Sequence, residues 1–206
     1  SFTMVHNIII THDHADHIKS VGSLSRSYEM PVYATQTVHQ GIVRNYCVRS
    51  KIPESNKRII EKNVPFRAGD FDITAFNVPH DSSDNVGYQI KYGDTVFSIM
   101  TDAGHVTEEM ADIIGKSDYL VLESNYDEDM LRDGPYPEYL KKRIRGDYGH
   151  LCNNDCAAAL ATNASERLRH VWLCHLSEEN NHPEIARKTV EHVLETSETC
   201  RNRDFI

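Results

Sequence analysis

The 206-residue sequence has no apolar run near the roughly 18 residues that a membrane-spanning helix needs. It also shows no charged-then-apolar leader, so we expect a cytoplasmic protein with no membrane partner. Its five cysteines are an odd number without a framework spacing, which favours reduced thiols over a disulfide scaffold. No internal repeat, low-complexity tract or G-x-S-x-G serine-nucleophile motif is visible.

The composition is that of a globular protein, with 39% hydrophobic and 26% charged residues. This length predicts one domain, residues 1–206, with an ordinary buried core. The formal net charge of −9 is unusual for a protein that binds nucleic acid, because polyanions are normally met by basic surface. One basic cluster, residues 141–145, is compatible with a solvated helix face or with a phosphate contact, and both interpretations stay open.

Hydrophobic periodicity predicts a mixed α/β fold. Helices are expected over residues 15–29, 36–46, 107–115, 137–145, 153–164 and 183–197. Strands are expected over residues 8–10, 31–34, 71–78, 86–92, 95–100, 119–122 and 171–174, and residues 47–62 are expected to form an exposed loop or lid. The order is typical of a sheet sandwich flanked by helices.

The segment Thr11-His12-Asp13-His14-Ala15-Asp16-His17 directly follows the first expected strand. Alternate residues of an extended chain share a face, so His12 and His14 would bind one metal ion. Asp16 and His17, at the start of the next helix, would face a second position. Imidazole with carboxylate suits zinc, iron or manganese better than calcium or magnesium.

Three further candidate ligands each follow a predicted strand, as site residues do in α/β folds: His80, Asp102 and His175. Taken singly, an Asp or His at a strand end is more often a cap or a satisfied polar group. The agreement among several such positions is what favours a functional set.

The histidine-rich segment resembles the metal-binding motif of the metallo-β-lactamase superfamily. Blocks along nearly the whole chain are similar to the bacterial YycJ/WalJ (VicX) branch: Val78-Pro79-His80-Asp81, Met100-Thr101-Asp102-Ala103-Gly104, Leu122-Glu123-Ser124-Asn125, Gly149-His150-Leu151-Cys152-Asn153 and residues 175–181. The resemblance implies an αββα sandwich. In that family several strands and a helix precede the histidine segment, so we expect this chain to lack the N-terminal part of the fold.

The resemblance also implies two divalent metal ions per chain, zinc or manganese, with iron a further option. The first would be held by His12, His14 and His80, the second by Asp16, His17 and His175, and Asp102 would bridge them. A water between two metals ionises near neutral pH and would be the nucleophile. The branch implies a nuclease, a 5′–3′ DNA exonuclease type of phosphodiesterase, whose partner is nucleic acid, DNA rather than RNA.

The leaving oxygen of a phosphodiester needs a proton, and Asp16 and His150 are the candidate donors. For His150 a plain helix-entry role, with Asn153 as the helix N-cap, is an equal alternative. Ser82, Ser83, Asn125 and Asn180 are candidate substrate-binding residues, although the two serines equally suit a turn. Glu123 is a candidate to orient a metal-binding histidine.

Two other functions share the first motif. A small-molecule hydrolase of the lactonase, glyoxalase II or β-lactamase type would use the same nucleophile on a carbonyl. An RNA-processing nuclease is the nearer alternative, although too few residues separate Asp102 from His175 for the β-CASP insertion. A third alternative to the DNA exonuclease is a metal-binding module without catalytic activity. The sequence leaves the oligomeric state open.

Overall fold

The computed structural model describes residues 5–196. The chain forms two compact units, which are described separately. The first comprises the residues up to Asn77 together with Asp81–Tyr92, and the second comprises Val78–His80 and the residues from Gly93 onward.

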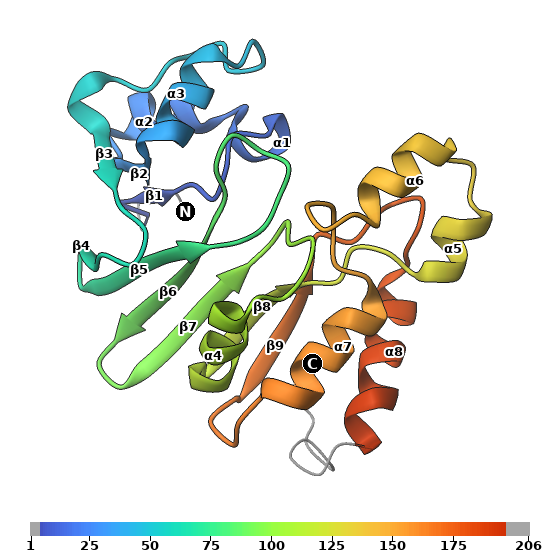
Figure 1. The fold of residues 1–206 in the computed structure, drawn as a ribbon. Helices are drawn as coiled ribbons and strands as arrows, with labels where there is room; N and C mark the ends of the chain where they lie inside the picture. Colours follow the sequence, from blue (N-terminus) through green and yellow to red (C-terminus); the bar gives the residue numbers. More distant parts are fainter. Residues whose placement is uncertain (1–4, 197–206) are drawn as a thin grey trace. The chain divides into compact units, whose positions relative to one another are not determined.

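The first unit contains a parallel sheet in the order β1-β2-β3 (Figure 1). Its strands are β1 (Ile8–Ile9), β2 (Val32–Thr35) and β3 (Lys57–Ile60). A 3-10 helix, η2 (Glu54–Asn56), directly precedes β3. Its helices are α1 (Ala15–Ile18), α2 (Val21–Tyr28) and α3 (Gln36–Arg44). Apolar residues from these helices and strands form one buried cluster, which includes Ile10, Ile18, Val32, Val38 and Ile42.

Three antiparallel strands complete this unit: β4 (Phe66–Ala68), β5 (Phe71–Asn77) and β6 (Val86–Tyr92). Their inward residues, among them Ile73, Ala75 and Tyr88, form a second buried cluster, against which Ile9 and Tyr33 pack. The Tyr88 hydroxyl donates to the Ile10 carbonyl over 2.7 Å. This bond ties β6 to the segment that leads into the histidines.

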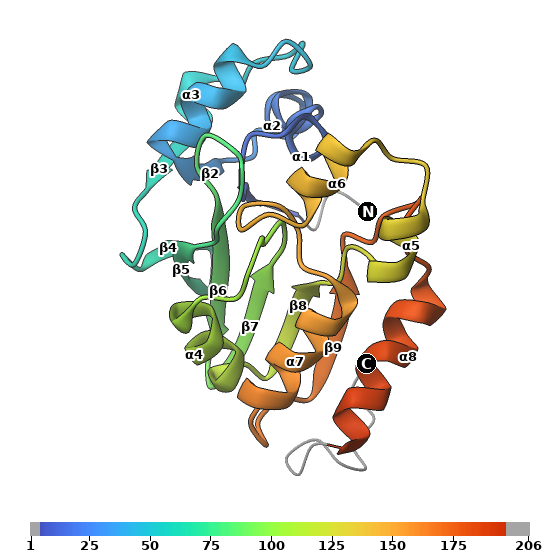
Figure 2. The same ribbon diagram turned by 45° about the vertical axis from the view of Figure 1, so that its right-hand side comes forward.

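The second unit is built on the parallel strands β7 (Thr95–Met100), β8 (Tyr119–Glu123) and β9 (His170–Cys174). The helices are α4 (Glu108–Lys116), α5 (Glu128–Asp133), α6 (Glu138–Ile144), α7 (Asn153–Asn163) and α8 (Pro183–Thr196). Helices α4 and α7 lie over one face of these strands (Figure 2). Because the strands are parallel, their carboxyl ends bring Asp102, Glu123 and His175 to one edge.

Most of the predicted elements are present, and three predictions need correction. The loop or lid expected over 47–62 contains β3, which gains its hydrogen bonds from β2. The helix expected over 15–29 is two helices, separated at Lys19 and Ser20. Strand β4 and helix α5 were not predicted, and Cys152 rather than Asn153 is the N-cap of α7. The end of the last predicted helix, Ser197, lies outside the described residues.

None of the helices in the described part of the chain combines the length and apolarity needed to cross a bilayer. Among the described residues, Cys47, Cys152, Cys156 and Cys174 are free cysteines.

Candidate metal centre

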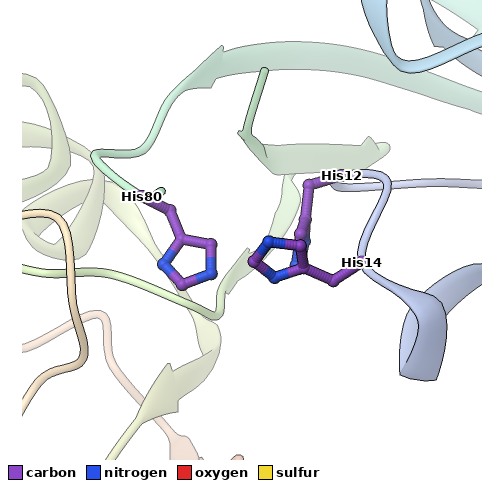
Figure 3. A group of neighbouring side chains, drawn as sticks. All are labelled: His12, His14 and His80. Atoms are coloured by element: carbon purple, nitrogen blue, oxygen red, sulfur yellow. The ribbon is translucent and has the colours of Figure 1, made fainter. Parts of the chain in front are cut away.

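The histidine segment of the first unit folds into a compact group of rings. The side chain of His12 is fully buried. Its ring lies 4.6 Å from that of His14 and 4.1 Å from that of His17, measured between centroids, and Figure 3 shows the first of these pairs. The Thr11 hydroxyl lies 3.1 Å from Nδ1 of His12 and 3.4 Å from Nδ1 of His17. Both rings thus turn the same nitrogen toward one hydroxyl, and their Nε2 atoms are the donors suited to a cation.

Asp13, between the histidines, has a structural role. Its carboxylate accepts a hydrogen bond from the Ser83 hydroxyl over 2.7 Å, and its carbonyl accepts one from the Asn45 amide over 3.1 Å. Helix α3 approaches so closely that a Cβ atom at Gly41 would lie 1.9 Å from Asp13 Oδ2. A side chain at position 41 would therefore displace the carboxylate of Asp13, which fixes the ligand loop to its surroundings.

Two acidic residues flank the same rings. Asp81 Oδ1 lies 3.9 Å from Nε2 of His14, and Asp16 Oδ2 lies 3.6 Å from Nε2 of His17. The Asp16 side chain is largely exposed. The first unit thus gathers His12, His14, Asp16 and His17, four of the predicted ligands.

In the second unit, the buried carboxylate of Asp102 lies between two imidazoles. Its Oδ1 is 3.7 Å from Nε2 of His80 and 3.4 Å from Nδ1 of His175. Asp102 and His175 both have left-handed backbones, with φ values of 58° and 55°. Non-glycine residues rarely adopt this conformation, and such strain concentrates at functional sites.

Glu123, at the end of β8, is the fully buried hub of this group. One carboxylate oxygen accepts from Nδ1 of His175 over 2.6 Å and from Nδ1 of His150 over 2.9 Å. The other accepts from the backbone amides of Ala103 and Leu151. Burial favours the neutral acid, but the hydrogen bonds from the two histidines outweigh it and lower the pKa of Glu123 to about 2.

The ring of His80 is also oriented through its Nδ1 atom, in this case by a backbone carbonyl. Its Nδ1 lies 3.0 Å from the Gly149 oxygen, so the ring donates there and keeps Nε2 as a lone-pair donor. Nitrogen and oxygen atoms of Asp102, Glu123, His150 and His175 lie within 4.8 Å of one another. Imidazole nitrogens with oriented Nδ1 protons and a buried carboxylate fit a divalent cation such as zinc.

The four predicted substrate-binding residues hydrogen-bond within the protein. Ser82 donates to the Asp84 carbonyl, Ser83 to Asp13, and Asn125 to the His175 carbonyl. The side chain of Asn180 is fully buried. Contacts of these residues with substrate stay predictions, as do the roles of the individual metal ligands.

Sequence reasoning anticipated Glu123 as an orienting carboxylate, although not that it would serve His150 and His175 together. It missed the buried pair Asn153 and Asn181, whose side chains hydrogen-bond across 28 residues. No local pattern marks such a pair.

Comparisons with known proteins identify the family to which the chain belongs. The sequence-family model described as the beta-lactamase superfamily domain matches residues 1–175 of this chain. Exodeoxyribonuclease YycJ of Bacillus anthracis is 37% identical over 93% of this chain and 71% of the relative. Exodeoxyribonuclease WalJ of Streptococcus pneumoniae is 38% identical over 96% of this chain and 73% of the relative.

Solved structures show the same fold. Zn²⁺-bound PqqB from Methylobacterium extorquens has a TM-score of 0.70, with 20% identity over 91% of this chain and 69% of its own. The metallo-β-lactamase fold protein YhfI from Bacillus subtilis has a TM-score of 0.68, with 19% identity over 93% of this chain and 75% of its own.

The fold and the superfamily match define a metallo-β-lactamase-fold hydrolase of a divalent-metal-binding class. Within that class, the chain belongs to the family of the YycJ and WalJ exodeoxyribonucleases. The predicted fold class and family are confirmed, and so is the prediction of a hydrolytic enzyme.

Proposed function

We propose that the protein is a DNA exonuclease that hydrolyses phosphodiester bonds with the help of two divalent cations. The names of the curated relatives support the reaction and the substrate. The single observation that carries the two-cation arrangement is the position of Asp102, whose carboxylate is flanked by His80 on one side and His175 on the other.

The first cation is assigned to His12, His14 and His80, as the resemblance to the metallo-β-lactamase superfamily implies. Two contacts within single units support this assignment. His14 lies beside Asp81, the residue that follows His80 in the chain. His80 directs Nδ1 to the Gly149 carbonyl, which reserves Nε2 for a ligand bond.

The second cation is assigned to Asp16, His17 and His175, with Asp102 shared between the two. His175 donates Nδ1 to Glu123, so Nε2 is its ligand atom. A buried carboxylate with a candidate metal-binding imidazole on either side suits a bridging ligand.

When bound, two such cations lower the pKa of water and neutralise the charge that builds on the phosphate in the transition state. The protein's own residues supply the proton for the leaving oxygen. Glu123 accepts from Nδ1 of His150 and thereby orients the ring, which makes Nε2 of His150 the first candidate atom to deliver the proton. Asp16 is the second candidate donor.

We assign zinc or manganese as the native metal, with iron as the alternative, because the donors are imidazoles and carboxylates. The cation charge would also offset the net charge of −9 where the DNA backbone approaches. The four free thiols of the described chain support a reducing compartment, the cytoplasm.

The test uses protein purified without chelators and then loaded separately with Zn²⁺ or Mn²⁺. Turnover is compared on 5′-labelled DNA, 3′-labelled DNA, RNA of the same sequence, bis-p-nitrophenyl phosphate and a β-lactam. We expect metal-dependent release of nucleotides from the 5′ end of DNA. Turnover of the lactam alone, or faster degradation of RNA than of DNA, would contradict the proposal.

A further inference from the structure

A buried network of amide and hydroxyl side chains lies behind the candidate metal centre, and the reaction proposed above makes no use of it. Its members are Ser124, Asn125, Asn153 and Asn181, whose side chains are all buried. Ser124 and Asn125 follow β8, Asn153 is the first residue of α7, and Asn181 lies two residues before α8, all in the second unit.

Asn153 and Asn181 form a reciprocal amide pair. Nδ2 of Asn153 donates to Oδ1 of Asn181 over 3.0 Å, and Nδ2 of Asn181 donates to Oδ1 of Asn153 over 2.9 Å. The Ser124 hydroxyl donates to the same Asn153 oxygen over 2.7 Å. Only an amide can donate and accept in this way, so a carboxylate at either position would face an acceptor.

Asn181 also fixes the main chain that follows β8. Its Nδ2 lies 2.8 Å from the Ser124 carbonyl and 3.0 Å from the Asn125 carbonyl. These two hydrogen bonds from Asn181 fix the backbone conformation of the segment that follows β8.

Residues 123–125 in turn form two hydrogen bonds with His175. Glu123 accepts from Nδ1 of the ring over 2.6 Å, and Nδ2 of Asn125 donates to the His175 carbonyl over 2.6 Å. The Asn125 carbonyl also accepts from the Ser177 amide over 2.8 Å. His175 sits at a φ of 55°, a conformation that a non-glycine residue keeps only where its surroundings hold it.

We propose that Asn181, paired with Asn153, is a positioning residue that sets the orientation of the His175 imidazole toward the second cation. It acts through Ser124 and Asn125 and touches neither cation nor substrate. The inference rests on the assignment of His175 as a ligand in the proposed function.

The experiment compares the full chain with Asn181→Asp and Asn153→Asp. The first variant removes the donor to two carbonyls, and the second keeps the Asn153 acceptor while removing its donor to Asn181. Cobalt is the probe: the visible spectrum of the Co²⁺-loaded protein reports ligand geometry, and competition with a chromogenic chelator reports the affinity of each cation. Chemical unfolding of the metal-free proteins reports stability separately.

Two controls separate positioning from general loss of stability. Asn154→Asp makes the same substitution at the neighbouring exposed residue of α7, whose amide contacts only Glu128 among the described residues. Val190→Ala opens a cavity in α8, at a fully buried side chain, and lowers stability without touching the network.

For Asn181→Asp we expect the affinity of the weaker-bound cation to fall about tenfold or more, the range seen when groups that orient a ligand are changed. The Co²⁺ spectrum should change as well, with a smaller effect in Asn153→Asp. Neither control should alter the spectrum or the affinity, even though Val190→Ala unfolds at lower denaturant concentration. If Asn181→Asp does not fold, the inference is tested by the cation affinity and the Co²⁺ spectrum of Asn153→Asp, which should change in the same direction.

An unchanged spectrum and affinity in a folded variant of either residue, with only stability reduced, would overturn the inference. His175→Ala keeps this failure distinct from failure of the proposed function. If His175→Ala still binds both cations with unchanged affinity, the ligand assignment is wrong and the inference falls with it. If His175→Ala loses a cation while the asparagine variants do not weaken it, the positioning role alone is refuted.

Discussion

Nδ1 of His175 lies 2.6 Å from a carboxylate oxygen of Glu123, whose side chain is fully buried. A carboxylate in this position fixes the tautomer of the histidine and makes its other nitrogen a better ligand. The same oxygen accepts from His150. One buried charge therefore orients a proposed ligand and a proposed proton donor.

Replacing Glu123 by Gln should weaken the binding of the second cation. Glutamine keeps the size of the side chain but loses the negative charge, so neither imidazole is held as firmly. We expect an affinity loss of about 10- to 100-fold, measured by chelator competition. Glu128→Gln, at an exposed position of α5, is the control and should bind as the wild type does. Equal affinities in the two variants would contradict the role of Glu123.

Replacing Gly104 by Ala should disturb the loop that carries His150. A Cβ atom at position 104 would lie 2.2 Å from the Asp147 carbonyl oxygen, so the two loops must separate. Displacement of a catalytic group by about 1 Å can cost about 100-fold in rate, and we expect a loss of that order in kcat on DNA. In Gly146→Ala the nearest backbone atom would be 3.3 Å away, and we expect a much smaller loss. Similar rates in the two variants would refute the prediction.

Asp118 should contribute to stability in a pH-dependent way. Burial alone would raise its pKa, but hydrogen bonds from the Val96 amide and from Arg167 outweigh it and hold the pKa below 3.8. A lowered pKa in the folded state stabilises the protein above pH 3.8, and the contribution disappears as the pH falls through the lowered value. Asp118→Asn should lower the free energy of unfolding by about 1 to 3 kcal/mol at pH 7.

Urea unfolding of the metal-free proteins between pH 7 and pH 3 tests this window. The difference between wild type and Asp118→Asn should be constant down to about pH 4 and should shrink below it. Asp129→Asn, at an exposed position, serves as the control. A difference that grows on acidification would show that another group is responsible.

The candidate ligand positions could be proposed from the sequence because the loops that carry them each follow an apolar strand. The run before His12 is β1 of the first unit, and the runs before Asp102 and His175 are β7 and β9 of the second unit, where parallel pairing through β8 brings their ends to one edge. Helices α3 and α4 were predicted within two residues at each end, because amphipathic spacing begins at a threonine cap in each.

The missed elements lack such local signals. Strand β3 begins with Lys57 and Arg58, and its Ile59 is exposed, so its pattern does not alternate; pairing with β2 decides its conformation. Strand β4 has only three residues. The break at Lys19 and Ser20 carries no glycine or proline. The contact of Asn153 with Asn181 is non-local, and only the folded chain reveals it.

The most direct test of the two-cation account is the metal content and DNA turnover of Asp102→Ala beside the wild type. We measure metal per chain by elemental analysis after loading with Zn²⁺ or Mn²⁺ and gel filtration, and hydrolysis of 5′-labelled DNA on the same samples. The account predicts two ions per wild-type chain, and no turnover with at most one retained ion in the variant. Two retained ions together with sustained hydrolysis in Asp102→Ala would contradict it.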